Sequence, residues 1–426
     1  MSLTKRILLS MIAGLVVGVL LNLGKEWLNV SVNAWLDEFV VYGIFDTVGR
    51  IFVASLKLLV VPLVFVSLVC GASQLGGNAR MGAMAAKTLV LYMLTTGIAI
   101  ALALLMGNLM QPGAGIGLGE ATTFSPKEAP ALKEVLVNIF PSNPIKAMAD
   151  GNMLQVIVFS LLMGVAVASS GETGARVSQW FEDMNAIIMK MVQILMELAP
   201  YGIFCLLAKL FAGLGAGAIL ELGKYFFTVV LVLLLHGLVI YGLLLRILAG
   251  VSPLQFFRHL KDLVIFAFST ASSNATIPIT LRTVEKNLGV DNRIASFTVP
   301  LGATINMDGT AIMQGVATAF IAQAYQVDIG LGGYLTVILT ATLASVGTAG
   351  VPGVGLVTLA MVLQQVGLPV EGIALIIGVD RLLDMMRTAV NVTGDSMVSL
   401  TVAKSEDSWD EATFSQRGPA AEGSER

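Results

Sequence analysis

GVDRLLDMMRTAVNVTGD, the stretch from Gly378 to Asp395, places three aspartates and two arginines inside what otherwise resembles a membrane helix. The apolar run EGIALII precedes it and SMVSLTVA follows it. Charged groups are rare at membrane depth, and where they occur they usually have a function. The five charges therefore decide how the rest of the sequence is interpreted.

The polar residues of this stretch share one helix face. Asp380, Asp384, Arg387, Asn391 and Asp395 are spaced 4, 3, 4 and 4, which forms a single stripe at about 3.6 residues per turn. Five charges facing lipid would cost on the order of 15 kcal/mol, at about 3 kcal/mol each. We therefore expect the stripe to face protein partners or a cavity, and internal salt bridging is the purely structural alternative.

The overall composition is that of a membrane protein with several spans. Of 426 residues, 56% are hydrophobic and 12% are charged, against about 25% charged in soluble chains; the mean hydropathy is +0.84. Apolar runs of or near the roughly 20 residues that cross a bilayer recur at 7–23, 51–72, 89–110, 153–168, 226–248 and 334–346. We predict an all-α polytopic membrane protein in contact with the lipid bilayer, without a nucleic-acid partner.

The distribution of basic residues predicts the orientation of the chain. Cytoplasmic loops are enriched in Lys and Arg, and one side of the expected spans carries Lys5, Arg6, Arg80, Lys87, Arg246, Arg258, Lys261, Arg282, Lys286, Arg293 and Lys404. The opposite connections near 24–40, 326–333 and 365–372 hold one basic residue, Lys25. We predict that both termini are cytoplasmic, that the membrane is the cell inner membrane, and that the polar tail 405–426 is disordered.

Polar stretches of sequence interrupt the apolar spans in the second half of the chain. FSTASSNATIPIT (268–280) and ASVGTAGVPGVG (344–355) each combine small or hydroxyl residues with a proline, and LGATINMDGTAIMQG (301–315) lies between them. Non-helical backbone at membrane depth must be enclosed by protein or line a watery cavity. Two such breaks in corresponding halves indicate a transporter binding site, so we predict two re-entrant helical hairpins.

The residue types in these segments suit a small solute and hard cations. Asn391 and Asp395 offer oxygen ligands one turn apart, and NMDGT adds Asn306 and Asp308; such oxygens suit hard cations. Arginine offers a planar fork that matches a carboxylate. No Ser/His/Asp arrangement is apparent, and we interpret His236, which is isolated in the sequence, as a hydrogen-bonded interior residue and not as a proton relay. The chemistry favours an anionic or zwitterionic solute bound beside alkali cations, and not an enzyme.

Four motifs together resemble the dicarboxylate/amino acid:cation symporter family, which includes glutamate and aspartate transporters. SSNATIP, GATINMDGT, SVGTAGVPG and DMMRTAVNVTGD stand in family order, and the resemblance extends from about Ile7 to Lys404. It implies eight transmembrane helices and two re-entrant hairpins with inverted repeats, in a homotrimer that works as an elevator. Residues 1–84 and 113–216 would form the scaffold, and residues 85–112 and 217–404 the transport domain.

The resemblance also implies a substrate site. Arg387 would bind the side-chain carboxylate of the substrate and Asp384 its amino group. The remaining substrate-binding residues would be Ser272, Ser273, Thr310, Val351, Gly355, Thr388 and Asn391. Asp380, Arg381 and Gln314 would support the site.

Sodium is the implied coupling ion, at three positions. The first would use Asp395 with backbone oxygens of Gly302, Asn306 and Asn391. The second would use backbone oxygens of Thr304, Ser345, Val346 and Thr348. The third would use Tyr92, Thr95, Thr96, Asn306 and Asp308.

Two departures from the family pattern refine the expected function. Ala271 stands where archaeal members carry an arginine, and Arg381 in the last span resembles the mammalian branch. Gln314 stands where proton-coupled mammalian members carry a glutamate, and an amide does not carry a proton at physiological pH. We predict a sodium-coupled symporter of L-aspartate and L-glutamate. The alternatives are a C4-dicarboxylate or neutral amino acid symporter of the same family, or a substrate-gated anion conductance.

Overall fold

The computed structural model describes residues 3–25, 27–73, 79–116, 140–214, 217–345, 350 and 353–415. Within these ranges the chain is helical and contains no β-strand; Val290 and Trp409 form one isolated antiparallel bridge. The prediction of an all-α chain is therefore confirmed for the described residues.

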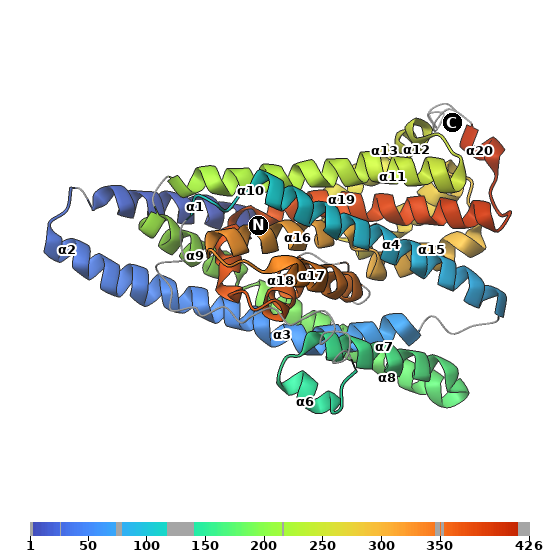
Figure 1. The fold of residues 1–426 in the computed structure, drawn as a ribbon, viewed down its shortest axis with the longest axis horizontal. Helices are drawn as coiled ribbons and strands as arrows, with labels where there is room; N and C mark the ends of the chain where they lie inside the picture. Colours follow the sequence, from blue (N-terminus) through green and yellow to red (C-terminus); the bar gives the residue numbers. More distant parts are fainter. Residues whose placement is uncertain are drawn as a thin grey trace, which may run out of the picture.

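The elements follow the chain as labelled in Figure 1. The first half contains α1 (Leu3–Gly24), α2 (Val30–Trp35), η1 (Leu36–Phe45), α3 (Asp46–Ser73), α4 (Ala79–Met110), α6 (Pro144–Ala149), α7 (Met153–Ser169), α8 (Gly171–Met196) and α9 (Ala199–Leu214). The second half contains α10 (Gly217–Leu234), η3 (Leu235–Ile240), α11 (Tyr241–Leu244), η4 (Leu245–Ala249), α12 (Pro253–His259), α13 (Lys261–Thr270), α14 (Ser273–Arg282), η5 (Thr283–Asn287), α15 (Asn292–Ile305), α16 (Asp308–Ala324), α17 (Gly330–Ser345), α18 (Val354–Gln365), η6 (Val370–Gly372), α19 (Ile373–Ser405) and α20 (Glu411–Ser415).

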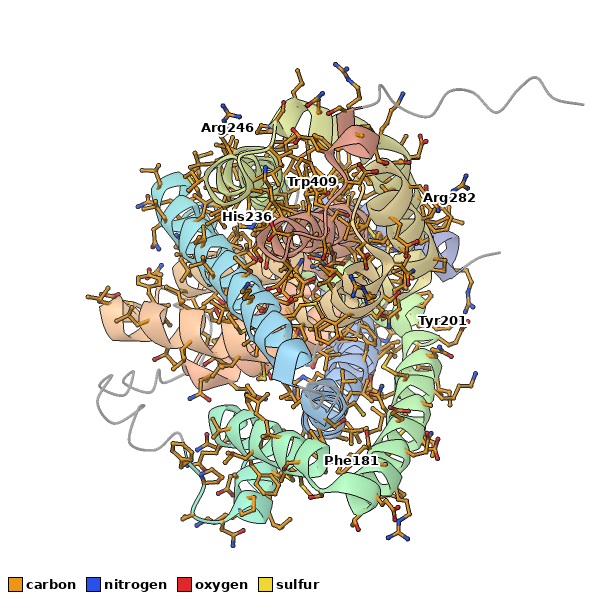
Figure 2. The ribbon with its side chains drawn as sticks, turned by 90° about the vertical axis from the view of Figure 1, so that its right-hand side faces the viewer. Phe181, Tyr201, His236, Arg246, Arg282 and Trp409 are labelled. Carbon is orange, nitrogen blue, oxygen red and sulfur yellow. The ribbon has the colours of Figure 1, made fainter. Side chains whose placement is uncertain are left out.

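The helices pack in two groups. In the first, α1 lies along α9, and α3 packs against α7, α8 and α9. In the second, α16 lies between α4 and α19, and α19 also contacts α10, α13 and α15. Figure 2 separates the groups: Phe181 and Tyr201 mark α8 and α9, whereas His236 and Trp409 lie in the group around α19.

Small residues set the closest helix approach in the first group. A Cβ atom at Gly14 would lie 2.6 Å from the carbonyl oxygen of Phe204, and one at Gly18 would lie 2.7 Å from that of Ala208. Only glycine therefore allows α1 to approach the backbone of α9 this closely, as small residues commonly do between membrane helices.

The outer surface and the helix lengths are those of a multi-pass membrane protein. By length and hydropathy, two described helices, Met84–Met110 and Leu222–Ala249, can cross a membrane. Gly171–Leu195 and Ala199–Gly213 add a third span if the pair, bent by 48°, is counted as one. Large apolar side chains such as Leu105 and Phe227 point outward, as lipid contact requires.

Three breaks interrupt the helices where the sequence is polar. Ala271, with φ of +50°, ends α13 before α14 begins. Asn306 and Met307 separate α15 from α16 in non-helical conformations. The third break separates α17 from α18, and within it Gly350 accepts hydrogen bonds from the Ser272 hydroxyl and from the amide of Asn274, at 2.8 and 3.1 Å. The first and third breaks therefore touch each other.

Part of the segment that was expected to be a disordered tail, residues 406–415, has a defined conformation, and residues 416–426 lie outside the described residues. Residues 406–410 lead into α20, which packs near the end of η5. Trp409 Nε1 donates to Leu288 O at 2.8 Å, and the buried ring of Phe414 contacts His259. These two aromatic residues supply the apolar contacts that a polar composition conceals, and they fix the segment.

Candidate functional site

All five residues of the polar stripe on α19 are buried. Arg387 is 0% exposed, and Asp380, Asp384, Asn391 and Asp395 are between 1% and 7% exposed. The spacing of the stripe predicts this arrangement, because one face of α19 turns towards α15, α16 and the α17–α18 region. The charges therefore face protein and not the outer surface.

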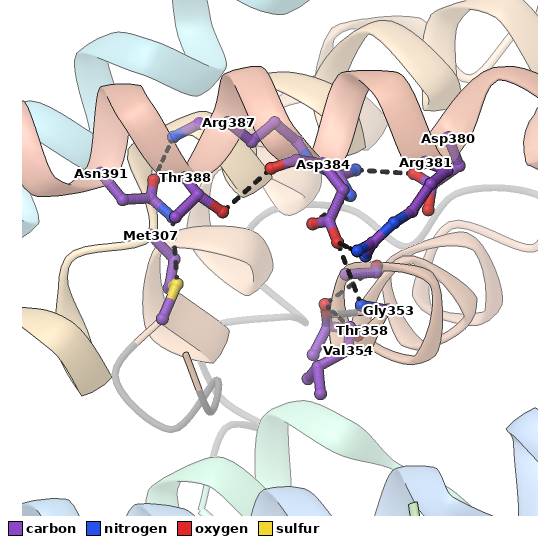
Figure 3. A network of polar contacts seen from close by, with 12 residues as sticks. Met307, Gly353, Val354, Thr358, Asp380, Arg381, Asp384, Arg387, Thr388 and Asn391 are labelled. Atoms are coloured by element: carbon purple, nitrogen blue, oxygen red, sulfur yellow. Dashed lines mark hydrogen bonds and ion pairs between the residues drawn. The ribbon is translucent and has the colours of Figure 1, made fainter. Parts of the chain in front are cut away.

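Arg387 joins two aspartates of its own helix. Its Nη1 donates to Asp380 Oδ1 and its Nη2 to Asp384 Oδ1, both at 2.8 Å. Arg381 Nη1 lies 3.5 Å from Asp384 Oδ2. Figure 3 shows these ion pairs as one network on the face of α19. We call these four residues the arginine cluster; its two negative and two positive charges sum to zero.

The arginine cluster lies open to two other elements. Gly353 donates its amide to Asp384 Oδ2 at 3.2 Å, so the N-terminal end of α18 meets the cluster. A Cβ atom at Gly355 would lie 3.4 Å from Arg387 Nη2 and 3.2 Å from Thr310 Cγ2. Arg387 Nε is buried and has no hydrogen-bond partner among the residues that the structure describes. A buried donor without a partner is costly, so the cluster has capacity for one more acceptor.

The other residues predicted to bind or support the substrate differ in how close they lie to the arginine cluster. Thr388 donates its hydroxyl to the carbonyl of Asp384 at 2.9 Å, and Asn391 Nδ2 contacts Met307 Sδ at 3.3 Å. Ser272 caps α14 and, as described, meets Gly350; Ser273 is buried beside it. Gln314 Nε2 donates to Thr358 at 2.7 Å. Val351 lies outside the described residues.

Two further buried aspartates lie nearby without an arginine. Asp395 Oδ1 accepts from Asn306 Nδ2 at 2.8 Å, and Asp308 Oδ1 accepts from the Thr96 hydroxyl at 2.5 Å. Both side chains are essentially unexposed. In the described part of the chain, neither has a lysine or arginine within 4.0 Å. We call Asp308, Asp395, Thr96 and Asn306 the oxygen cluster.

The polar groups around the break between α15 and α16 are suited to binding a cation in the oxygen cluster. Asn306 donates from Nδ2 to Asp395 and to the carbonyl of Asn391 at 3.0 Å, while its buried Oδ1 has no hydrogen-bond partner within the described ranges. Gly309 donates its amide to Asn391 Oδ1 at 2.8 Å. A buried carboxylate without a counter-ion is strongly disfavoured, and a hard cation takes carboxylate, amide and carbonyl oxygens. The residues present therefore fit an alkali cation.

Several predicted sodium ligands meet at this point and others do not. A Cβ atom at Gly302 would lie 2.4 Å from Asp395 Oδ1 and 2.5 Å from the Tyr92 hydroxyl, so these three residues converge. The Thr95 hydroxyl donates within its own helix at 3.1 Å. Thr304 and Ser345 were predicted to bind a separate ion through their backbone oxygens; the Thr304 hydroxyl donates to Leu301 O at 2.9 Å. Ser345 ends α17 and donates to Thr342. Val346 and Thr348 lie outside the described residues.

The sequence interpretation missed two partners of Asp308. The Tyr241 hydroxyl donates to Asp308 Oδ2 at 2.7 Å, and His236 Nε2 lies 3.1 Å from the same atom. His236 was predicted to be a hydrogen-bonded interior residue, and it is fully buried with Asp308 as its partner; the identity of that partner was not predicted. Helical spacing of 3.6 residues does not put positions 236 and 241 on one face, so it gave no signal that they act together.

Comparison with known proteins identifies what this chain is similar to. The sequence profile of the sodium:dicarboxylate symporter family matches residues 3–405. The chain is 31% identical to the proton/sodium-glutamate symport protein of Bacillus subtilis (94% of this chain, 92% of the relative). It is 34% identical to the proton/glutamate-aspartate symporter of Escherichia coli (96% and 94%). It is 30% identical to the C4-dicarboxylate transport protein of Bacillus subtilis (97% and 96%).

Proposed function

The chain belongs to the sodium:dicarboxylate symporter family and is a transporter, not an enzyme, and we propose that it is a sodium-coupled symporter of L-aspartate and L-glutamate. The glutamate and aspartate named in its relatives support this substrate class. The observation that carries the proposal is the arginine cluster, with the fully buried Arg387 between Asp380 and Asp384.

Arg387 recognises the side-chain carboxylate of the substrate. Its guanidinium presents a planar fork that matches a carboxylate with two parallel hydrogen bonds. In the present structure, aspartate side chains of the protein take these bonds. The substrate carboxylate exchanges with them, and the unused Nε donor offers a further contact.

Asp384 binds the amino group of the substrate. Once Arg387 turns to the substrate carboxylate, Asp384 Oδ1 loses its 2.8 Å partner and requires another cation. The α-ammonium group of an amino acid supplies it. A relative named as a C4-dicarboxylate transporter suggests a second candidate substrate. A C4-dicarboxylate has no ammonium group to replace Arg387 at Asp384 Oδ1, so Asp384 keeps only its Oδ2 contacts with Arg381 and Gly353.

Charge explains why transport requires sodium. The arginine cluster is neutral, and the oxygen cluster contributes the charges of Asp308 and Asp395. An acidic amino acid adds one further negative charge. Bound cations restore neutrality, and moving a neutral assembly through a low-dielectric environment avoids the penalty of a buried net charge.

Sodium ions bind at the oxygen cluster and at the α17–α18 break. Asp395 with the carbonyls of Gly302, Asn306 and Asn391 holds one ion. Tyr92, Thr95, Thr96, Asn306 and Asp308 hold another. Thr304 and Ser345, with Val346 and Thr348, hold the third. When bound, these ions supply positive charge only, and the protein supplies every oxygen ligand.

The finer architecture is part of the proposal. The contact between Ser272 and Gly350 supports two re-entrant hairpins, α13–α14 and α17–α18, whose tips meet over the site. The two packing groups of helices support a scaffold and a moving transport domain that work as an elevator. We further propose eight spans, a homotrimer, and cytoplasmic termini in the cell inner membrane.

Uptake into proteoliposomes tests this function. Purified full-length protein should concentrate radiolabelled L-aspartate inside vesicles when an inward sodium gradient is imposed, while proton and potassium gradients are varied independently. L-glutamate should compete, and succinate and serine should compete weakly. Uptake that is unchanged when choline replaces sodium would refute sodium coupling. Flux that never exceeds the external concentration would favour a conductance.

A further inference from the structure

A π-helical turn brings His236 and Tyr241 to the same oxygen of Asp308. In η3 (Leu235–Ile240), the amide of Tyr241 donates to the carbonyl of His236, five residues earlier. In an α-helix, residues five apart point about 140° away from each other. A π turn closes with five residues, so both side chains emerge on one face. Their rings are in contact, with centroids 4.6 Å apart.

The hydrogen bonds to Asp308 come from opposite sides of the carboxylate. Tyr241 and His236 engage Oδ2, whereas Thr96 of α4 engages Oδ1. A carboxylate that binds a cation only accepts hydrogen bonds, so in the proposed sodium-binding site His236 Nε2 would be the donor to Oδ2. All of these side chains are 0% exposed, so bulk solvent does not reach the carboxylate. Three donors from two helices therefore fix its orientation.

We propose that His236 and Tyr241 are positioning residues that set the sodium affinity of Asp308 without contacting the ion. They hold Oδ2 so that the Oδ1 edge faces Thr96 and α4. Partners of this kind orient metal ligands, and their loss typically lowers metal affinity about 10–100-fold. π turns are frequent at functional sites, and here the turn has a specific result, the pairing of two donors. The inference rests on the proposed role of Asp308 as a sodium ligand.

Sodium titration of three full-length variants in proteoliposomes tests the role. His236→Leu and Tyr241→Phe each remove one hydrogen bond to Oδ2, and His236→Gln keeps a donor on a side chain of similar length. The measured quantities are the sodium concentration for half-maximal aspartate uptake, and the KM for aspartate at saturating sodium. Tyr334→Phe is the matched control, because it removes a hydroxyl that donates to Asn108, far along the chain from these residues.

Positioning predicts a selective effect on the ion. His236→Leu and Tyr241→Phe should each raise the half-maximal sodium concentration about tenfold, with the KM at saturating sodium changed less than about twofold. His236→Gln should restore most of the sodium response. The double variant should lose less than the product of the two single effects, because both residues share one oxygen.

Parallel measurement of Asp308→Asn separates failure of the inference from failure of the proposed function. If Asp308→Asn raises the sodium requirement while His236→Leu and Tyr241→Phe do not, the positioning role is wrong and the sodium site stands. If Asp308→Asn leaves the sodium response unchanged, the sodium assignment itself is wrong. A lower maximal rate without a sodium shift would mark a structural role and overturn the proposal. If His236→Leu does not fold, Tyr241→Phe, which removes one oxygen atom, carries the test.

Discussion

The arginine cluster and the oxygen cluster contain two buried aspartates each, but they balance charge differently. Asp380 and Asp384 share the guanidinium of Arg387. Asp308 and Asp395 accept hydrogen bonds from hydroxyl, amide and imidazole groups, and in the described part of the chain no arginine or lysine reaches them. In the function that we propose, the first pair gives up Arg387 to the substrate carboxylate, and the second pair binds a cation that arrives from outside the protein.

Arg387→Cys should break this comparison most severely. Removing one partner from a buried ion pair costs about 3–5 kcal/mol, and the variant also loses the group that recognises the substrate carboxylate. We expect kcat/KM for aspartate uptake to fall at least about 100-fold. Arg293→Cys removes an exposed arginine and is the control. Unaltered aspartate affinity in Arg387→Cys would contradict the substrate assignment.

Asp395→Asn tests the oxygen cluster alone. The amide keeps the shape of the side chain but removes the negative charge that attracts the cation. We expect the half-maximal sodium concentration for uptake to rise at least about tenfold, which corresponds to ~1.4 kcal/mol. Asp328→Asn, at an exposed turn, is the matched control. If the sodium response of Asp395→Asn is normal, the ion does not depend on this carboxylate.

Asp380→Asn should sharpen the comparison by making the arginine cluster positive. Arg387 keeps Asp384 as a partner but loses one of the two carboxylates that compete with the substrate. We expect the KM for aspartate to fall about fivefold, since replacing a charged hydrogen-bond acceptor by a neutral amide weakens the competing bond by on the order of 1 kcal/mol. Competition with unlabelled aspartate measures the change. A rise in KM would indicate that Asp380 orients Arg387 for the substrate.

The smallest expected effect lies outside both clusters, at the start of α20. Hydrogen bonds from Thr413 and Ala412 lower the pKa of Asp410 below its ordinary value of 3.8. The ionised form is therefore favoured in the folded segment. Its contribution to α20 is present above pH 3.8 and is lost as the pH falls through the lower folded pKa. Fluorescence of a variant that keeps Trp409 as its only tryptophan measures this release, and Asp410→Ala should show it already at neutral pH.

The arginine cluster could be predicted from the sequence because it is local. Asp380, Asp384 and Arg387 lie on one helix, where spacing alone determines which side chains share a face. Which arginine pairs with which aspartate was seen only in the structure. Asp380 pairs with Arg387, although Arg381 follows Asp380 directly in the sequence.

The oxygen cluster could be predicted only in part because its residues come from separate helices. The break at Asn306 could be predicted because the sequence around it is polar. The contact between Thr96 and Asp308 could not, because it joins α4 to α16 across 212 residues. The contribution of His236 and Tyr241 was missed because it depends on a π turn, and such a turn leaves no periodic pattern in the sequence. The short helix α20 was missed for a different reason, because Trp409 and Phe414 give the polar segment 406–415 its apolar contacts.

The position of Asn391 between the two clusters has a thermodynamic consequence for how substrate binding and sodium binding depend on each other. Its side chain accepts from Gly309 and its carbonyl accepts from Asn306, which in turn holds Asp395. One helical turn before it is Arg387. If these contacts transmit binding, linkage is reciprocal: the factor by which sodium raises the affinity for aspartate must equal the factor by which aspartate raises the affinity for sodium. A sodium titration with and without aspartate and an aspartate titration with and without sodium must therefore give the same coupling constant.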